Sequence, residues 1–416
     1  MRRLEILHFS DLHLGVENYS RIDPESGLPT RLLDYLAALD EVVDVALAEH
    51  VDLVLFTGDM YKNREPTPTH QRELAKRIGR LARGGVPLFM VVGNHDLPNS
   101  PVRAHSVEIF DTLALERVHV AGKIGLHVIE TAAGPVQIVA LPWVPRSRVI
   151  RHDEAKNLTL AEINQRIVET IASTINSFAV DLDPNLPAIL AAHGQVYGAE
   201  FGSERSTTLG QDYVLSLGDL SPDRFDYIAL GHIHKFQKVR DRPPAIYAGS
   251  LQRTDFGEER EEKGYVRLSL SGGAEGRFEA TCRFERSRAA RPFFTLAVDA
   301  KSADDPTAVV LEAVARNSDR VHRAIVRLQI DLSAENERQF RDGDVRRALR
   351  DASYVAAIHR TVARPDRRRL PDVLAEQLTP REALALYLKA KDVDEARQTE
   401  LLEYADRLIA ETRLPD

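Results

Sequence analysis

The chain has 416 residues, of which 43% are hydrophobic and 28% charged, a balance that allows two or three folded domains with a large core. Its one cysteine, Cys282, excludes a disulfide framework and suits a reducing compartment. The 55 basic and 63 acidic side chains give a formal net charge of -8, which argues against a protein that grips nucleic acid through its overall charge.

The amino terminus does not have the pattern of a secretion signal. Residues 1–3 are followed by an apolar stretch, but Glu5, His8 and Asp11 interrupt it within a few positions. No apolar run approaches the length needed to cross a bilayer. We therefore expect a cytoplasmic protein with no membrane partner.

Five short apolar runs, rich in β-branched and aromatic residues, predict buried strands. They cover residues 4–10, 51–57, 86–92, 189–192 and 225–230. Longer segments of helical character lie between the first three runs, at residues 31–49 and 67–83. Alternation of strands and helices predicts an α/β fold, in which ligands bind beyond the carboxyl ends of the strands.

A short motif bearing histidine or aspartate follows each of the five runs. The motifs are Asp11-Leu12-His13, Gly58-Asp59, Gly93-Asn94-His95-Asp96, His193-Gly194 and Gly231-His232-Ile233-His234. Carboxylate, imidazole and amide ligands without a thiolate suit ions such as Mn, Fe or Zn. Two such ions about 3.5–4 Å apart can activate a water and hold the oxygens of a phosphoryl displacement. Together the motifs predict a two-metal phosphoesterase site.

This motif set resembles the calcineurin-like metallophosphoesterase superfamily. Within it, the chain is similar to the SbcD-type DNA double-strand-break repair nucleases, on two further stretches. These are His8-Phe9-Ser10-Asp11-Leu12-His13-Leu14-Gly15 and the segment from Tyr247 to Glu259, which contains Arg253-Thr254-Asp255-Phe256-Gly257-Glu258. The resemblance is specific over roughly the first two-thirds of the chain and general beyond it. It implies a four-layer sandwich of two mixed β-sheets flanked by helices, with a smaller α+β capping domain and C-terminal helices.

The resemblance also implies two divalent metal ions, with manganese as the expected metal. One ion would be held by Asp11, His13, Asp59 and His234. The other would be held by Asp59, Asn94, His193 and His232, with Asp59 bridging. His95 would face the scissile phosphate, stabilising the transition state or protonating the leaving oxygen, and Asp96 would orient its ring.

Lys62 departs from the family, in which many relatives carry a histidine or an acidic residue at this position. It could contact a DNA phosphate as a point charge, or be a solvated loop lysine. Basic residues also recur at helical spacing in the predicted helix at 67–83, namely Arg72, Lys76, Arg80 and Arg83. They could bind the DNA backbone or form an ordinary solvated helix face. Given the acidic net charge, we expect weak intrinsic DNA affinity.

Two other features favour structural interpretations. His8 lies inside the first predicted strand and is expected to be a hydrogen-bonded core histidine. The segment from Arg253 to Glu259 is expected to form a tight turn and a salt-bridged loop beside the sheet.

Residues 1–285 are expected to form the phosphoesterase domain, and residues 286–362 a small α+β domain. In the latter the pattern predicts strands at 293–299 and 324–331 and helices at 305–316 and 338–351. The resemblance implies that this second domain is a cap that helps position DNA.

Residues 363–378 are expected to be an exposed linker, followed by a helix pair at 379–416. Thr379-Pro380-Arg381-Glu382 predicts a capping box with proline at the first helical position, and a second helix begins near Asp394. Two short helices after a linker could dock on their own chain or in a partner's groove. The resemblance implies the second, with the coiled-coil root of an SbcC-type ABC ATPase as the partner.

The leading hypothesis is a manganese-dependent DNA nuclease, with 3′→5′ exonuclease activity on duplex ends and endonuclease activity on single strands. The resemblance implies a homodimer, with residues 101–115 among the expected dimer helices. Two alternatives remain open. The chain could be another calcineurin-like phosphodiesterase or phosphatase, because metal ligands do not identify a substrate. It could also be a non-catalytic scaffold of the ATPase complex.

Overall fold

The computed structural model describes residues 3–98, 103–149, 158–202, 213–272, 277–363, 378–391 and 393–412. The chain divides into two compact units. The larger comprises Met1–Leu296, Val314–Leu328 and Arg346–Ile358, and the smaller comprises Ala297–Ala313, Gln329–Val345 and His359–Asp416.

The first large sheet has the strand order β14-β13-β1-β2-β3-β4. Its strands are β1 (Leu4–Phe9), β2 (Leu53–Thr57), β3 (Leu88–Val91), β4 (Val118–Ala121), β13 (Gly264–Gly272) and β14 (Phe278–Arg286). Strands β1 to β4 pair in parallel, whereas β13 and β14 are antiparallel additions. The predicted strands at 4–10, 51–57 and 86–92 are confirmed.

The second large sheet has the order β11-β12-β10-β7-β6-β5. Its strands are β5 (Gly125–Ile129), β6 (Val136–Leu141), β7 (Ala188–His193), β10 (Tyr227–Gly231), β11 (Gln237–Asp241) and β12 (Pro244–Tyr247). The four inner strands are parallel and the two edge strands antiparallel. The predicted strands at 189–192 and 225–230 are therefore also confirmed, and both sheets are mixed.

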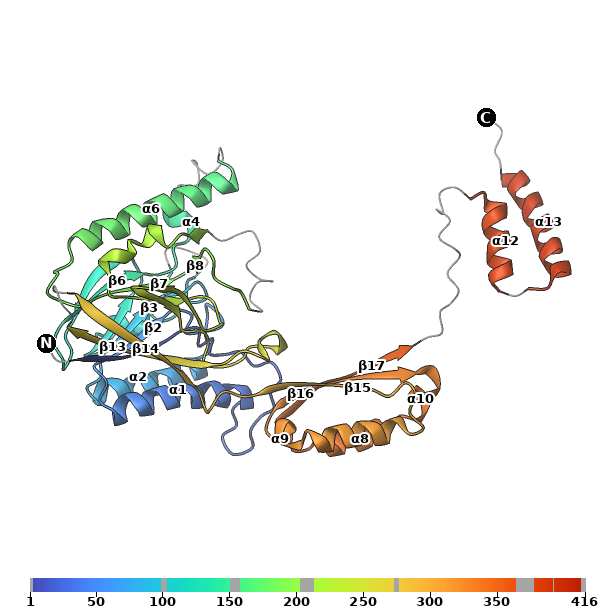
Figure 1. Ribbon diagram of the computed structural model, residues 1–416, viewed down its shortest axis with the longest axis horizontal. Helices are drawn as coiled ribbons and strands as arrows, with labels where there is room; N and C mark the ends of the chain where they lie inside the picture. Colours follow the sequence, from blue (N-terminus) through green and yellow to red (C-terminus); the bar gives the residue numbers. More distant parts are fainter. Residues whose placement is uncertain are drawn as a thin grey trace. The chain divides into compact units, whose positions relative to one another are not determined.

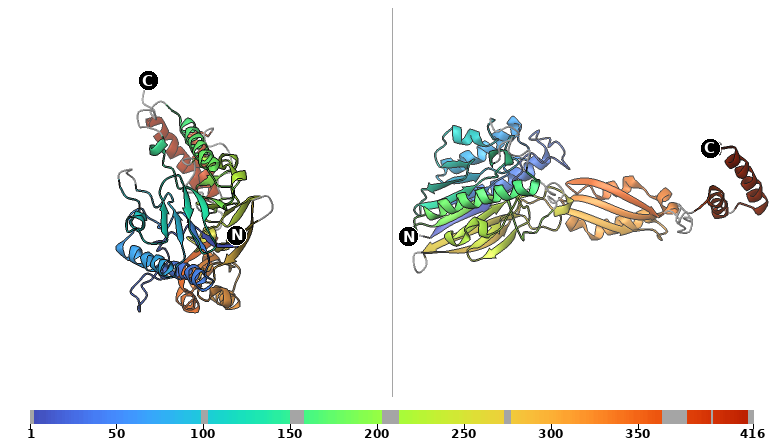
Figure 2. Two further views of the ribbon diagram at one scale, coloured as in Figure 1. Left: turned by 90° about the vertical axis from the view of Figure 1, so that its left-hand side faces the viewer. Right: turned by 90° about the horizontal axis from the view of Figure 1, so that it is seen from above.

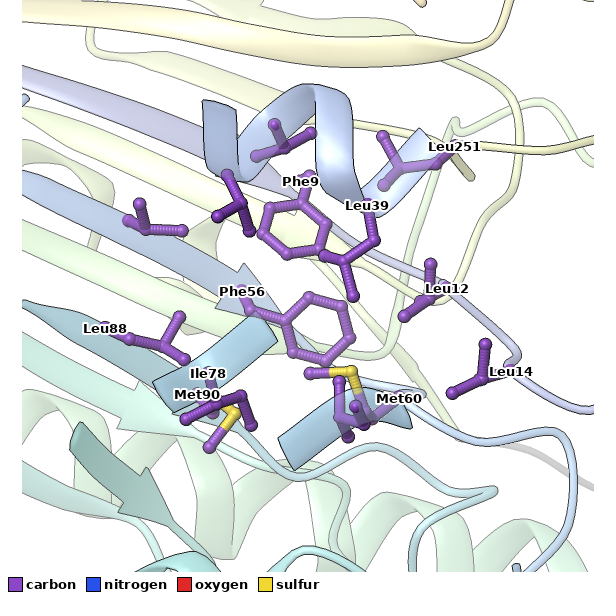
Figure 3. Close-up of a cluster of buried hydrophobic side chains, with 14 of the residues drawn as sticks. Phe9, Leu12, Leu14, Leu39, Phe56, Met60, Ile78, Leu88, Met90 and Leu251 are labelled. Atoms are coloured by element: carbon purple, nitrogen blue, oxygen red, sulfur yellow. The ribbon is translucent and has the colours of Figure 1, made fainter. Parts of the chain in front are cut away.

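Helices cover the outer faces of the two sheets (Figure 1, Figure 2). Helices α1 (Thr30–Ala48) and α2 (Pro68–Arg83) pack on the first sheet, where Leu39 and Ile78 meet Phe9 and Phe56 in a buried cluster (Figure 3). Helix α6 (Leu160–Val180) packs on the second sheet. A third cluster fills the space between the sheets. This is the four-layer sandwich that the resemblance implied.

Local sequence explains how α6 is placed. Thr159 accepts from the backbone N–H of Glu162, whose side chain in turn accepts from the backbone N–H of Thr159, a reciprocal capping box. Ile167, Ile171 and Ile175 recur every four residues, so they share one face of the helix and are fully buried against the sheet.

Short elements connect the layers. They are α3 (Glu108–Thr112), α4 (Arg146–Val149), β8 (Gln195–Val196), β9 (Val214–Leu215) and the 3-10 helices η1 (Gly218–Leu220), η2 (Pro222–Arg224) and η3 (Phe256–Glu258). Strands β8 and β9 form a parallel pair.

A three-stranded sheet of order β15-β16-β17 follows. Its strands are β15 (Phe293–Asp299), β16 (Ile325–Ser333) and β17 (Tyr354–Ala363), and its helices are α8 (Pro306–Arg316), α9 (Ser318–Val321), α10 (Ala334–Gln339) and α11 (Asp342–Ala348). The single helix predicted at 338–351 is wrong, because Phe340 has extended backbone angles (φ -71°, ψ 123°) and separates α10 from α11. The expected domain boundaries stay a prediction.

Helices α12 (Pro380–Ala390) and α13 (Glu395–Thr412) pack on each other. The predicted capping box is present, with Thr379 and Glu382 capping each other. Of the linker expected at 363–378, residues 364–377 lie outside the described residues, and Ala363 is the last residue of β17. Among the described helices, none combines the length and apolarity needed to span a membrane.

Candidate metal centre

The five motifs meet where β1, β2, β3, β7 and β10 end. The backbone N–H groups of Asp11 and His13 donate to the carbonyls of Gly58 and Asp59, each at 3.0 Å, which joins the first two motifs. The backbone N–H of His232 donates to the Asp11 carboxylate at 3.1 Å and so ties the second sheet to the first. Segments far apart in sequence are thus fixed around one point.

Asp11, His13 and His234 form a first group of potential ligands. One nitrogen or oxygen atom from each lies within 4.8 Å of the others. The Nε2 atoms of His13 and His234 are 2.9 Å apart. All three side chains are buried or nearly so, so their polar atoms face one another rather than solvent.

Asp59 lies between this group and a second one. Its Oδ2 atom is 3.7 Å from Nε2 of His13 and 3.4 Å from Nε2 of His193. Beyond it, Oδ1 of Asn94 is 3.0 Å from Nε2 of His193 and 3.2 Å from Nδ1 of His232. The structure therefore brings together all seven side chains expected to be ligands, with Asp59 in the middle.

The charges at this centre perturb one another. Burial alone would raise the pKa of Asp59, but His193 and the other imidazoles around it hold the pKa well below its usual range. Burial would lower the pKa of His193, but the carboxylates of Asp59 and Asp11 outweigh this and raise it to about 9. Burial and then the neighbouring His193 lower the pKa of His232 to about 3.

Four of the predicted ligands have a backbone conformation that side chains other than glycine rarely adopt. The φ angles are 50° for Asp11, 48° for His13, 61° for Asp59 and 103° for His232. Such strain persists only where surrounding contacts impose it, and it concentrates at functional sites. The tertiary contacts of the fold therefore impose on these four residues a backbone conformation that is unfavourable for the isolated chain.

The glycines of the motifs are required by close packing. A Cβ atom at Gly58 would lie 2.1 Å from Nδ1 of His193, and one at Gly93 would lie 2.2 Å from Oδ1 of Asp59. Each glycine therefore lets a ligand side chain approach the backbone of a neighbouring motif.

Two histidine rings are oriented by a hydrogen bond from Nδ1. In His193 this atom donates to the carbonyl of Thr57 at 2.7 Å, and in His234 it donates to the Glu258 carboxylate at 2.8 Å. Carbonyls and carboxylates only accept, so Nδ1 carries the proton and Nε2 is presented as the ligand atom. The motif pattern did not identify Glu258 as a functional residue, although it lies in the segment from Arg253 to Glu259.

Glu258 is fully buried and lies in a network of hydrogen bonds and ion pairs. It pairs with Lys263 at 2.8 Å and accepts from the hydroxyl of Thr254 at 2.6 Å. Burial alone would raise the pKa of Glu258, but Lys263 and His234 hold it well below its usual range. The tight turn and salt-bridged loop expected for this segment are therefore confirmed, and the loop also supports His234.

His8 is the core histidine that was expected. It is fully buried, with Nδ1 2.9 Å from the hydroxyl of Tyr227 and Nε2 3.0 Å from that of Thr57.

The partner of His95 differs from the expectation. Its Nδ1 donates to the backbone carbonyl of Lys62 at 3.0 Å, and its ring lies edge-on to that of His13. Asp96 instead accepts from the backbone N–H groups of Gly93 and Asp59 at 3.0 Å, and also from that of Met60. The expectation that Asp96 orients the His95 ring is thus corrected.

Asp96 rather fixes the loop that carries Asp59. It is fully buried, and burial together with the charge of Asp59 raises its pKa to about 7, although the backbone donors oppose this rise. The Lys62 side chain is exposed, and it is the main-chain oxygen that contacts His95. A backbone contact of this kind leaves no signal in the side-chain pattern.

Trp143, the one tryptophan of the chain, packs against His232. The two rings are stacked, with centroids 5.2 Å apart and an interplanar angle of 29°. Tyr213 stacks on Trp143 at the same distance and angle. Trp143 is thereby a further neighbour of the centre that the motif pattern did not include.

Three of the four basic residues singled out on α2, namely Arg72, Lys76 and Arg80, are already ion-paired. Arg72 and Lys76 each contact Glu73 at 2.8 Å, and Arg80 contacts Asp40 of α1 at 2.9 Å. This favours the interpretation of an ordinary helix face, and a role in DNA binding stays a prediction.

The donor set fits divalent metal ions. Its imidazole nitrogens, carboxylates and amide oxygen belong to largely buried side chains, and a thiolate is lacking among the described residues nearby, which suits borderline to hard ions. The arrangement can therefore hold cations beside a bound anion such as a phosphate ester.

Comparison with known proteins agrees with this chemistry. The calcineurin-like phosphoesterase family matches residues 4–236. The chain is 27% identical over 292 residues to the SbcD component of the SbcCD nuclease from Rhodobacter capsulatus, covering 65% of this chain and 67% of that protein.

Two archaeal relatives carry the name DNA double-strand break repair protein Mre11. The chain is 24% identical over 344 residues to that of Thermoplasma acidophilum, covering 80% of this chain and 79% of that protein. It is 24% identical over 343 residues to that of Methanosarcina acetivorans, covering 82% of this chain and 47% of that protein. The chain thus spans about half the length of the Methanosarcina relative.

Proposed function

Since the chain belongs to the calcineurin-like phosphoesterase family, we propose that it is a metal-dependent DNA nuclease of double-strand-break repair. The observation that supports the chemistry is the largely buried set of seven proposed ligand side chains, which has Asp59 in the middle. The substrate is proposed from the relatives, whose names are those of a nuclease component and of DNA double-strand break repair proteins.

We assign two divalent ions to the centre, with manganese as the metal. Asp11, His13, Asp59 and His234 would hold one ion. Asp59, Asn94, His193 and His232 would hold the other. When bound, such ions supply an activated water and neutralise charge on the phosphate oxygens.

His95 is the proposed catalytic residue outside the ligand set. With Nδ1 held by the Lys62 carbonyl, its Nε2 atom remains to act on the substrate. From this position it would stabilise the transition state or, when Nε2 carries a proton as well as Nδ1, protonate the leaving oxygen as a general acid. Asp96 contributes indirectly, because it holds the backbone of Asp59.

The finer activities follow the resemblance. We propose 3′→5′ exonuclease activity on duplex ends and endonuclease activity on single strands, with an SbcC-type ATPase bound at α12 and α13. Tyr387, Tyr404 and Leu408 are large hydrophobic residues exposed on this helix pair, which supports such a contact. A homodimer through the region of α3 is also proposed, where Ile109 and Leu113 are exposed.

The deciding experiment is cleavage of end-labelled duplex, hairpin and single-stranded DNA with Mn2+ or Mg2+, with and without an SbcC-type ATPase. Asp59→Ala should lose the bound ions and the cleavage together. His95→Gln should keep the ions while cleavage falls by about 10²- to 10⁴-fold, the usual contribution of a general acid.

The alternatives give different results in the same assays. Brisk hydrolysis of cyclic nucleotides, with DNA intact under every condition, would contradict the nuclease and favour another phosphodiesterase. A purified chain that binds no metal would instead favour the non-catalytic scaffold.

A further inference from the structure

The 3-10 helix η3 has contacts on two sides, and one of them is with a proposed metal ligand. On that side Glu258 receives the hydrogen bond from Nδ1 of His234 at 2.8 Å. Lys263, also buried, donates to the other Glu258 oxygen at 2.8 Å and to the backbone carbonyl of His234 at 3.0 Å. Both the ring and the main chain of His234 therefore depend on where η3 lies.

The other side of η3 contacts β15 and β16 of the three-stranded sheet β15-β16-β17, which we call the small sheet. Glu259, the residue after η3, accepts from the backbone N–H of Thr295 at 2.8 Å and from its hydroxyl at 2.6 Å. Thr295 belongs to β15. Its hydroxyl also accepts from Nη2 of Arg327, on β16, at 3.0 Å.

Arg327 makes a second contact with the same short helix. Its guanidinium carbon lies 4.3 Å from the centroid of the Phe256 ring, in a cation–π arrangement. Phe256 in turn meets Phe293 of β15 edge-on, with centroids 4.9 Å apart. Strands β15 and β16 thus hold η3 by hydrogen bonds at one position and by ring contacts at another.

We propose that Thr295 and Arg327 are positioning residues for the metal ligand His234. They fix η3 on the side away from the ligand, and η3 presents Glu258 to the His234 ring. The inference rests on the proposed metal site, and it gives this part of the small sheet a role in metal binding. That role is separate from the positioning of DNA.

The test compares Thr295→Val with Thr295→Ser in the full chain. Valine has nearly the shape of threonine but lacks the hydroxyl that donates to Glu259 and accepts from Arg327, whereas serine keeps it. Mn2+ binding is measured by calorimetry, and unfolding temperature is measured alongside. Lys301→Ala serves as a control. It removes the ion pair between Lys301 and Asp331 of β16, at 3.1 Å, and neither residue is part of the contacts with η3 described above.

We expect Thr295→Val to weaken one of two Mn2+ binding events by about three- to tenfold. This is less than the loss of about 10–100-fold in metal affinity that is typical when the direct hydrogen-bond partner of a ligand is mutated. The other event should be unchanged, and Thr295→Ser and Lys301→Ala should bind like the wild type. Equal loss in all three variants would mean general destabilisation and would overturn the proposal. Unchanged binding in a folded Thr295→Val protein would overturn it as well.

Arg327→Met provides a second variant if Thr295→Val does not fold, with the same expected loss and the same overturning result. The outcome can be separated from that of the proposed function. A wild-type protein that binds two Mn2+ ions but cleaves no DNA contradicts the nuclease and leaves this inference standing. A wild type that cleaves DNA, beside positioning variants with unchanged Mn2+ binding, contradicts the inference alone.

Discussion

The imidazole rings of the metal centre are held by contacts of different kinds. His193 donates to a backbone carbonyl and His234 to the Glu258 carboxylate, so hydrogen bonds select their tautomers. His232 is stacked on Trp143, a contact that restrains the plane of the ring. The backbone of His232 has a strained φ of 103°, which persists only where surrounding contacts impose it. Stacking on Trp143 is one of these contacts.

The stacking predicts an optical signal. Trp143 is the one tryptophan, and its ring lies 5.2 Å from that of a proposed ligand, so paramagnetic Mn2+ held by His232 should quench its emission. We expect a saturable decrease on titration with Mn2+ and little change with Mg2+, measured by fluorescence. The decrease should be absent in Asp59→Ala. Equal quenching in that variant would show that the signal comes from elsewhere.

At the scale of elements, the site depends on how closely β10 approaches β2. A Cβ atom at Gly231, in β10, would lie 1.9 Å from the carbonyl oxygen of Thr57, in β2. That oxygen also accepts the hydrogen bond from His193. The carbonyl oxygen of Thr57 therefore lies where the two sheets approach closely and also orients the ring of the proposed ligand His193.

Gly231→Ala is expected to be destabilising, because the new Cβ atom would collide with the backbone carbonyl of Thr57, which cannot move away by a side-chain rotation. A cost of about 1–3 kcal/mol or more in the free energy of unfolding is typical of such overpacking. Gly194→Ala is the matched control, since a Cβ atom there meets nothing within 4 Å. Urea unfolding measures both. Equal costs for the two variants would contradict the argument.

The helix pair gives a prediction about partners. Tyr404 and Leu408 lie four residues apart on α13 and are 60% and 49% exposed, an apolar patch of the kind that partner grooves bind. Tyr404→Arg combined with Leu408→Arg should weaken binding of an SbcC-type ATPase at least about tenfold, if the patch is central to the contact. Pull-down and calorimetry measure this. Glu403→Arg, which reverses the charge at an adjacent exposed position and leaves the apolar side chains in place, should bind nearly normally.

For the whole molecule, the sequence predicts best what is encoded locally. The apolar runs before Asp11, Asp59 and His193 predict buried strands, and parallel strands bring their carboxyl ends together, so convergence of the motifs could be expected. The helix predicted at 338–351 fails at Phe340, whose ring lies under Arg360, because tertiary packing overrides helical periodicity there.

Contacts made by backbone atoms and by distant loops could not be predicted. The carbonyl of Lys62 holds His95, yet any residue at this position would supply the same oxygen. Glu258 lies 24 residues from His234, and only the folded chain shows that they meet. The sequence predicts that Asp96 orients the ring of its neighbour His95, whereas its carboxylate accepts a hydrogen bond from the backbone N–H of Asp59.

The charge of the whole molecule leads to a prediction about DNA affinity. The formal net charge is -8, and Arg72, Lys76 and Arg80 are paired with carboxylates. We therefore expect weak DNA binding by the isolated chain, with a shallow dependence on salt. Fluorescence anisotropy with labelled duplex, from about 50 to about 200 mM salt, measures the slope, in which each neutralised phosphate contributes about 0.9.

Replacing Arg72, Lys76 and Arg80 together by alanine should change that slope by less than about 0.9, the contribution of one phosphate contact. The reason is that side chains already paired with carboxylates release few counterions from DNA. If all three instead bound phosphates, the slope would fall by nearly three contacts, and α2 would be a DNA-binding face. Addition of an SbcC-type ATPase should steepen the slope in the wild type and in the triple variant alike. Under this proposal the partner supplies most of the positive charge that contacts the DNA phosphates.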